Sequence, residues 1–92
     1  MTPEVLHDES GREFRLETDG VRAVLQYEFG GGVMAITHTL VPDAIGGRGI
    51  AAELTRAALH HARASGWKVR PLCSYAAAYL RNHTEYADLL PA

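Results

Sequence analysis

Short runs of alternating apolar and polar residues fill the first 40 positions and predict β-strands. Each run either places an apolar side chain at every second position or is rich in β-branched residues. The runs are Val5–His7, Phe14–Leu16, Val21–Tyr27 and Val33–Leu40. The turn-forming segments that separate them are Asp8–Gly11, Asp19–Gly20 and Gly30–Gly32. The pattern therefore predicts four consecutive strands joined by short turns.

The hydrophobic period changes in the second half of the chain. From Arg48 to about Ser65 apolar residues recur at helical spacing, and Gly66 follows as a natural helix stop. Trp67–Leu72 then has the composition of a short strand, and the alanine-rich segment Ser74–Arg81 has that of a second helix, closed by Asn82.

This order of elements, β-β-β-β-α-β-α, predicts an α+β domain. A helix that joins two strands implies a right-handed parallel crossover. We therefore expect a mixed, mostly antiparallel sheet that is α/β-like only in its one βαβ unit. The chain has 92 residues and no repeat, linker or low-complexity segment. Residues 1–92 should form a single domain.

Composition narrows the class of protein. The chain is 47% hydrophobic and 22% charged, which is typical of a folded globular protein. It has no apolar run long enough to cross a bilayer, and Met1–Glu4 does not open a secretory signal. The single cysteine, Cys73, agrees with a reducing compartment. A net charge of -2 gives little attraction to nucleic acid. We expect a cytoplasmic protein that binds neither nucleic acid nor membranes.

A glycine-rich segment, Gly46 to Ala51, joins the predicted fourth strand to the first helix. The start of a helix offers unpaired backbone amides and the positive end of the helix dipole, and glycines let a ligand approach that backbone closely. The segment therefore predicts a phosphate-binding loop. Arg48 could add a charge-assisted contact or remain solvated. The same glycines would also serve a sharp turn that binds nothing.

Several motifs follow one another between Thr37 and Leu90. They are His38-Thr39-Leu40-Val41-Pro42, Gly46-Gly47-Arg48-Gly49-Ile50-Ala51, Pro71-Leu72-Cys73-Ser74-Tyr75 and Tyr79-Leu80-Arg81-Asn82-His83. Together they resemble the minimal single-domain branch of the GNAT superfamily of N-acetyltransferases. The glycine segment is similar to that family's acetyl-CoA loop, Arg/Gln-x-x-Gly-x-Gly/Ala. Gly49 and Ala51 match its last two fixed positions, whereas Gly46 stands where arginine or glutamine is usual.

The resemblance implies a reduced GNAT fold that uses acetyl-CoA as a cosubstrate. The strand ending near Val41 would be splayed and would bind pantetheine, and amides of the loop would hold the pyrophosphate. Asn82 would either contact the cofactor or cap the helix. The residues implied in cofactor binding are Thr39, Val41, Gly46, Gly47, Arg48, Gly49, Ile50, Ala51 and Asn82.

Cys73 directly precedes the predicted second helix. The amides and dipole of a helix start would stabilise a thiolate there, which favours a nucleophile, although free cysteine also often fills space in a core. By the resemblance, Cys73 is a candidate acetyl acceptor. Two mechanisms stay open. The acetyl group passes through a Cys73 thioester, or the amine attacks acetyl-CoA directly while the protein supplies position and an oxyanion-binding amide.

Three further residues are candidates for proton transfer. His38, on the central strand, could deprotonate Cys73 or an incoming ammonium, or could be a hydrogen-bonded residue of the sheet face. Tyr75 could protonate the leaving thiolate of CoA, as the resemblance implies, or pack in the core with Tyr79. Glu28, at the end of the preceding strand, is a weaker candidate base, and a solvated charge is the favoured interpretation.

We therefore expect an acetyl-CoA-dependent N-acetyltransferase that acts on an amine. Larger GNAT proteins place helices between their first two strands, where this chain has only a turn. The acceptor side should thus be open and should suit a protein lysine or terminus. A monomer or a weak dimer is expected, and no metal site, because His60 and His61 point different ways on the helix. The alternatives are a non-catalytic acetyl-CoA or CoA-binding module and a small fold without a ligand.

Overall fold

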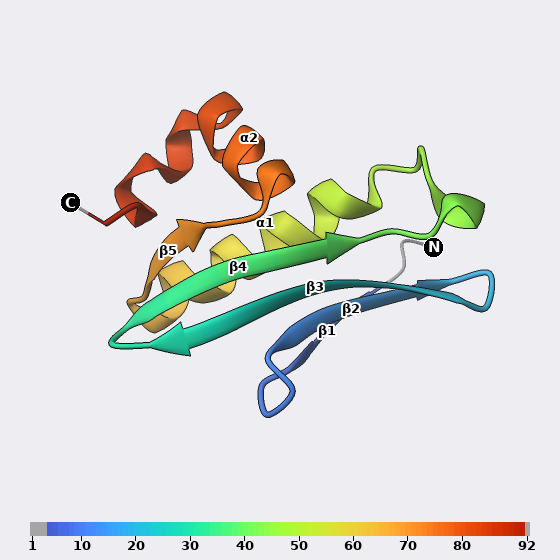
Figure 1. Ribbon diagram of the computed structural model, residues 1–92, viewed down its shortest axis with the longest axis horizontal. Coiled ribbons are helices and arrows are strands. Elements are labelled where there is room, and N and C mark those ends of the chain that lie inside the picture. Colours follow the sequence, from blue (N-terminus) through green and yellow to red (C-terminus); the bar gives the residue numbers. More distant parts are fainter. Residues whose placement is uncertain (1–3, 92) are drawn as a thin grey trace.

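The computed structural model describes residues 4–91, which form one five-stranded sheet with two α-helices and two short 3-10 helices (Figure 1). The elements in chain order are β1 (Val5–Asp8), β2 (Glu13–Thr18), β3 (Val21–Gly30), β4 (Val33–Leu40), η1 (Asp43–Ile45), α1 (Ile50–Ser65), β5 (Lys68–Pro71), α2 (Ser74–Asn82) and η2 (Thr84–Leu89). Residues 1–3, on which the expectation about a secretory signal rests in part, lie outside the described residues.

The strands are arranged in the order β1-β2-β3-β4-β5. The first four pair antiparallel, each with its neighbour in the chain, and β5 pairs parallel with β4. Helix α1 connects the two parallel strands. The predicted α+β class, with a mixed and mostly antiparallel sheet and one βαβ unit, is confirmed.

One face of the sheet packs against α1, which lies behind the strands in Figure 1, while α2 lies beside the β5 edge. Alternate residues of the central strands point toward α1 and are buried. These are Ala23, Leu25 and Tyr27 of β3 and Met34 and Ile36 of β4. Burying one such leucine or isoleucine contributes about 1.5–3 kcal/mol. Among residues 4–91, no helix has both the length and the hydrophobicity needed to cross a bilayer.

Strands β1, β2 and β3 are longer than the sequence predicted, and the ends of α1, β5 and α2 also differ from the prediction. Helix α1 begins at Ile50 rather than Arg48 because Gly49 adopts a left-handed conformation with φ 75°, which is not helical. Strand β5 begins at Lys68 because the Trp67 amide is used to close α1, donating to Ala62 O at 2.8 Å. The predicted stop at Gly66 is confirmed, with φ 75°. Helix α2 extends to Asn82, so this residue is helical and His83 is the C-cap.

A bulge at Thr37 changes which way the end of β4 faces. In the pairing of β3 with β4, Tyr27 is opposite Ile36, but its neighbour Gln26 is opposite His38. Thr37 is thus an extra residue, and its hydroxyl donates to Gln26 O at 3.2 Å. Thr39 pairs with the buried Leu25 and therefore faces α1. His38, paired with Gln26, lies on the opposite face.

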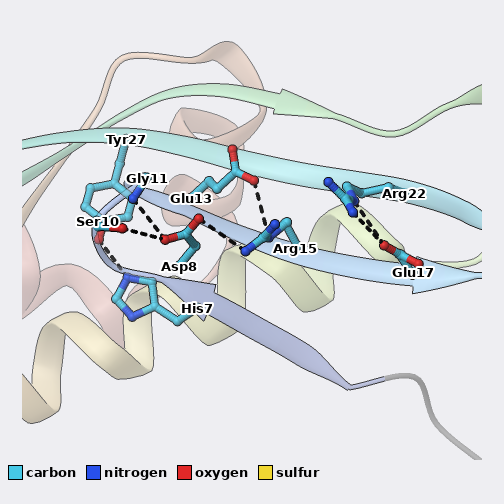
Figure 2. Close-up of polar contacts among 9 residues, drawn as sticks. All are labelled: His7, Asp8, Ser10, Gly11, Glu13, Arg15, Glu17, Arg22 and Tyr27. Carbon is cyan, nitrogen blue, oxygen red and sulfur yellow. Dashed lines mark hydrogen bonds and ion pairs between the residues drawn. The ribbon is translucent and has the colours of Figure 1, made fainter.

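We call this opposite side of the sheet the open face. It carries a row of residues from four adjacent strands, namely Leu6, Arg15, Val24 and Leu40. Figure 2 shows the guanidinium of Arg15 between the carboxylates of Asp8 and Glu13, at 3.2 and 3.4 Å, and the ion pair of Arg22 with Glu17 farther along the strands. This mixture of charges and exposed leucines is what a sheet face without a covering helix displays.

A cluster of aromatic and imidazole rings joins β1 to α1 on the buried side of the sheet. The ring of His7 stacks on Phe14 with centroids 4.1 Å apart, and His7 Nε2 lies 2.7 Å from the hydroxyl of Tyr27 (Figure 2). The ring of His61 meets His7 edge to face at 4.3 Å. Burial, followed by the nearby His61, lowers the pKa of His7.

Candidate functional site

Strand β5 pairs with only the first half of β4, and this leaves an unpaired edge along residues 37–40. The last register pair is Ile36 with Pro71. The carbonyl of Ile36 then accepts hydrogen bonds from the amides of both Leu72 and Cys73, each at 3.0 Å. After Cys73 the chain turns into α2. The end of β4 thus separates from the β5–α2 connection, as expected for a splayed strand.

Cys73 and Thr39 meet beside this unpaired edge. The Sγ of Cys73 lies 3.5 Å from Thr39 Oγ1 and accepts a hydrogen bond from the amide of Ala76 at 3.3 Å. Cys73 is the N-cap of α2, so the prediction that it directly precedes the helix is confirmed. An amide hydrogen bond and the helix dipole both favour a negatively charged sulfur. The arrangement is suited to a nucleophilic thiolate.

The glycine loop lies at the same end of the sheet, because β4 runs into it and β5 runs parallel to β4. Gly47 and Gly49 have φ of 76° and 75°, a conformation that glycine adopts without strain, and open space surrounds both. Gly49 caps α1 without any side-chain hydrogen bond. The first three amides of α1, from Ile50 to Ala52, precede the first helical hydrogen bond, which Glu53 N makes to Gly49 O. They are therefore available to an anion.

Arg48 points toward the turn between β2 and β3. Its Nη1 donates to Asp19 Oδ2 at 2.6 Å, and the side chains of Arg48 and Asp19 are 48% and 66% exposed. Two roles for Arg48 were predicted from the sequence, a phosphate contact or a solvated position. In the structure Arg48 forms an exposed ion pair with Asp19. Such a pair contributes little to stability, typically about 0.2–1 kcal/mol. Arg48 can therefore exchange Asp19 for another anion at small cost.

A hollow of about 260 Å³ lies between α1 and α2. It is lined by Ala52, Arg56, Tyr75, Ala78, Tyr79, Asn82 and His83. Tyr75 is 39% exposed here, whereas Tyr79 is 7% exposed and stacks on His83 at 3.9 Å. The two tyrosines that the sequence placed on one helix face thus have different environments. Burial, followed by the proximity of Tyr79, raises the pKa of Tyr75, which keeps its hydroxyl protonated near neutral pH.

His38 lies in a second hollow, of about 560 Å³, on the open face. Its lining residues come from β3, β4 and the turn between β1 and β2, and are Ser10, Gly11, Arg12, Gln26, Tyr27, Glu28, Thr37 and His38. Two of the candidate bases, His38 and Glu28, are thus neighbours. The side chain of His38 is on the other side of β4 from Cys73, so the described structure does not bring these two together.

Two further candidates of the glycine loop, Ile50 and Gly46, differ in the use of their backbone amides. The side chain of Ile50 is buried, which leaves its amide as the group that a ligand could reach. Gly46 packs over Asp43 and its amide donates to Asp43 O at 3.1 Å. Within the part of the chain that the structure describes, no group of three or more His, Cys, Asp or Glu side chains is placed to hold a metal ion.

Two residues of these hollows were not singled out in the sequence. Arg56 lines the hollow between α1 and α2, and its position one helical turn after Ala52 is the signal that could have placed it there. Arg12 reaches Glu28 on β3, 16 residues away, with Nη1 to Oε2 at 3.0 Å. The Arg12–Glu28 contact could not be predicted from a local sequence pattern, because it forms only when the two strands pair.

Three comparisons with known proteins bear on this arrangement. The family model of the GCN5-related N-acetyl-transferases matches residues 13–89. Protein NATD1 of Gallus gallus is 39% identical over 83 residues, which cover 87% of this chain and 76% of that protein. Protein NATD1 of Homo sapiens is 39% identical over 82 residues, covering 86% and 73%. The solution structure of a GCN5-like protein from Staphylococcus aureus superposes with a TM-score of 0.76 and 29% identity, covering 97% of this chain and 88% of that one.

Proposed function

The chain belongs to the GCN5-related N-acetyltransferase family, and from that premise we propose that it transfers an acetyl group from acetyl-CoA to an amine acceptor. The observation that most supports the proposal is that three features lie at one end of the sheet. They are the unpaired edge of β4, the uncapped start of α1 and the N-cap Cys73 of α2. These are the groups that an extended thioester ending in a pyrophosphate would need.

Acetyl-CoA would bind mainly to the backbone. The pantetheine would pair with the unpaired edge of β4 at Thr39 and with Val41, which directly follows the strand. The pyrophosphate would accept hydrogen bonds from the glycine loop, from Gly47 to Ala51. Gly46 supplies no cationic side chain, and Arg48 can compensate if it leaves Asp19. Asn82 and Tyr75 would border the cofactor from the hollow between α1 and α2.

The chemistry follows either of two routes. In the direct route the neutral amine nitrogen attacks the thioester carbonyl, a C–N bond forms and the C–S bond breaks. The CoA thiolate takes a proton from the Tyr75 hydroxyl, and the surplus proton of the nitrogen passes through water and restores that hydroxyl. In the covalent route the Cys73 thiolate attacks first and releases CoA, and the amine then attacks the Cys73 thioester. The hydrogen bond that the Ala76 amide donates to Cys73 Sγ supports the covalent route, because an amide donor favours the thiolate, and the Thr39 hydroxyl lies 3.5 Å from the same sulfur.

Intact-mass measurement after incubation with acetyl-CoA tests the covalent route. A single added acetyl group is expected, and it should be absent in Cys73→Ala. If Cys73→Ala still acetylates an amine at the wild-type rate, the direct route replaces the covalent one. If acetyl-CoA raises the melting temperature but no amine is ever acetylated, the chain is a CoA-binding module. If CoA does not change the melting temperature, the loop serves only as a turn.

The compartment and the oligomeric state of the protein are inferred from the sequence. The single Cys73 agrees with a reducing compartment, and we propose that the protein acts in the cytoplasm. We also propose that it acts as a monomer or a weak dimer, which sedimentation across a range of protein concentrations would test.

A further inference from the structure

The hollow between α1 and α2 carries a positive charge that no carboxylate neutralises. Its lining contains no acidic residue and consists of Ala52 and Arg56 of α1, Tyr75, Ala78, Tyr79 and Asn82 of α2, and the C-cap His83. Among residues 4–91, five other arginines form ion pairs with carboxylates, whereas Arg56 forms none. The guanidinium of Arg56 is therefore available to an anion that enters the hollow.

The hollow adjoins the place where the proposed reaction would occur. Tyr75 forms one of its walls, and the Tyr75 hydroxyl is the group that would protonate the CoA sulfur. Arg56 acts on the same hydroxyl, because burial and then Tyr79 raise the pKa of Tyr75 and the positive charge of Arg56 opposes this rise. Cys73, the other sulfur that would carry the acyl group, is two residues before Tyr75. An acyl chain longer than acetyl, attached to either sulfur, can thus reach the hollow.

We propose that this hollow receives the acyl chain of the donor and that Arg56 holds a carboxylate at the end of that chain. Dicarboxylic acyl-CoA thioesters such as succinyl-CoA are then donors beside acetyl-CoA. The inference rests on the proposed acyl transfer and names a further class of donor for it. A neutral amine nitrogen forms a C–N bond to the thioester carbonyl carbon, the C–S bond breaks, and CoA leaves as the thiol with the proton that the nitrogen loses. The terminal carboxylate is not consumed, so the product amide carries its negative charge.

The size and the polar groups of the hollow suit such a chain. An acetyl group ends in a methyl group, which would leave most of the 260 Å³ to water. Ala52 lies one helical turn before Arg56 on the same face of α1, and Ala78 lies opposite on α2, so small apolar side chains can contact two methylene groups. The guanidinium of Arg56 and the amide of Asn82 can donate hydrogen bonds to a carboxylate beyond them.

CoA itself has another anion that an arginine could hold, the 3′-phosphate on its ribose. That phosphate lies beyond the pyrophosphate, at the opposite end of the molecule from the sulfur. In the proposed binding mode the pyrophosphate is at the glycine loop and the sulfur is near Cys73 and Tyr75. Because Tyr75 also borders the hollow, the group closest to Arg56 is the acyl chain rather than the ribose.

Binding of unreactive thioethers is the first test, because it does not depend on turnover. The probes are CoA bearing a 2-oxopropyl, a 2-oxopentyl or a 4-carboxy-2-oxobutyl group, which mimic the acetyl, butyryl and succinyl donors. In isothermal titration, the wild type should bind the carboxylate probe about threefold to tenfold more tightly than the uncharged probe of equal length.

Arg56→Gln should abolish that preference and keep the fold, because Arg56 is exposed and glutamine is a good helix former. Arg81→Gln should retain the preference, since Arg81 is an exposed arginine of α2 outside the lining of the hollow. Equal affinities of the wild type for the two long probes would overturn the donor class and leave acetyl transfer standing.

Dephospho-CoA and transfer assays separate the remaining explanations. Arg56→Gln should change the affinity for neither CoA nor dephospho-CoA; a loss for CoA alone would assign Arg56 to the 3′-phosphate and overturn the acyl carboxylate. With Nα-acetyl-lysinamide as the amine, Arg56→Gln should raise the KM for succinyl-CoA and leave the KM for acetyl-CoA unchanged. Transfer from acetyl-CoA only would remove the donor class alone. Transfer from neither donor would remove both proposals.

Discussion

Thr39 Oγ1 lies 3.5 Å from Cys73 Sγ, across the point where β4 and the β5–α2 connection separate. The two residues are 34 positions apart in the chain, and the sulfur also accepts the amide of Ala76 at 3.3 Å. The Ala76 amide is a donor to the sulfur, and the Thr39 hydroxyl becomes a second donor when the sulfur is a thiolate, so the arrangement can hold negative charge there.

Thr39→Val should therefore slow the reaction of Cys73 with iodoacetamide. Valine keeps the β-branched shape and removes the hydroxyl, so the thiolate loses one donor. A net hydrogen-bond contribution of about 0.5–1 kcal/mol corresponds to a rate about twofold to fivefold lower. The control is Thr37→Val, because Thr37 donates to Gln26 O and is not bonded to Cys73. Equal alkylation rates in all three proteins would show that the hydroxyl does not act on the sulfur.

Substitutions of Cys73 should separate stability from chemistry. Cys73 Sγ caps α2, so Cys73→Ala removes that cap and should cost about 0.5–1 kcal/mol, or about 2–8 °C in melting temperature. Serine is a stronger N-cap, so Cys73→Ser should melt no lower than the wild type. Both variants should fail to gain an acetyl group from acetyl-CoA. A Cys73→Ser protein as unstable as Cys73→Ala would contradict the capping role.

Asp19→Asn should tighten CoA binding about twofold to fivefold, because it releases Arg48 from its exposed ion pair. Asparagine tolerates the left-handed backbone of Asp19, whose φ is 53°, so the turn is retained. Arg48→Ala should weaken CoA binding, and Glu17→Gln should leave it unchanged. Isothermal titration with CoA measures all three. An unchanged dissociation constant in both Asp19→Asn and Arg48→Ala would exclude Arg48 from the phosphate site.

Stability should fall as the pH drops from about 6.5. Burial and His61 lower the pKa of His7 in the folded state, so below pH 6.5 the unfolded chain binds the proton more readily than the folded one. The lost free energy accumulates until the pH reaches the depressed pKa of His7. Urea unfolding at pH 7.5 and 5.5 should show the loss in the wild type and a smaller loss in His7→Phe, which keeps the stack on Phe14. Equal losses would assign the effect to other groups.

The order of the elements and the fold class were predictable because the hydrophobic period changes from two to about 3.6 near Arg48. Gly66, with its left-handed backbone, marked the end of α1 correctly. Cys73 could be placed before a helix because the alanine-rich segment starts directly after it. Each of these predictions depends only on residues that are close together in the sequence.

The directions of the key side chains were not predictable in the same way. The bulge at Thr37 results from the pairing of β4 with β3, and no local pattern in His38 or Thr39 reveals it. Arg48 forms an ion pair with Asp19, 29 positions away in the chain, and Arg12 forms one with Glu28, 16 positions away. Tyr75 and Tyr79 are four residues apart on α2 but differ in burial, and Tyr79 packs against His83 and against Tyr86 of η2. Tertiary contacts decide these features.

The single layer of β4 between the two faces has a consequence for the kinetics. If donor and acceptor approach from opposite sides of one strand, neither covers the route of the other, and no domain has to close over the first substrate before the second can bind. Direct transfer should then follow random addition of the two substrates, giving intersecting double-reciprocal lines with no preferred order in product inhibition. Parallel lines would instead indicate that CoA leaves before the amine reacts, which is the pattern required by a Cys73 thioester.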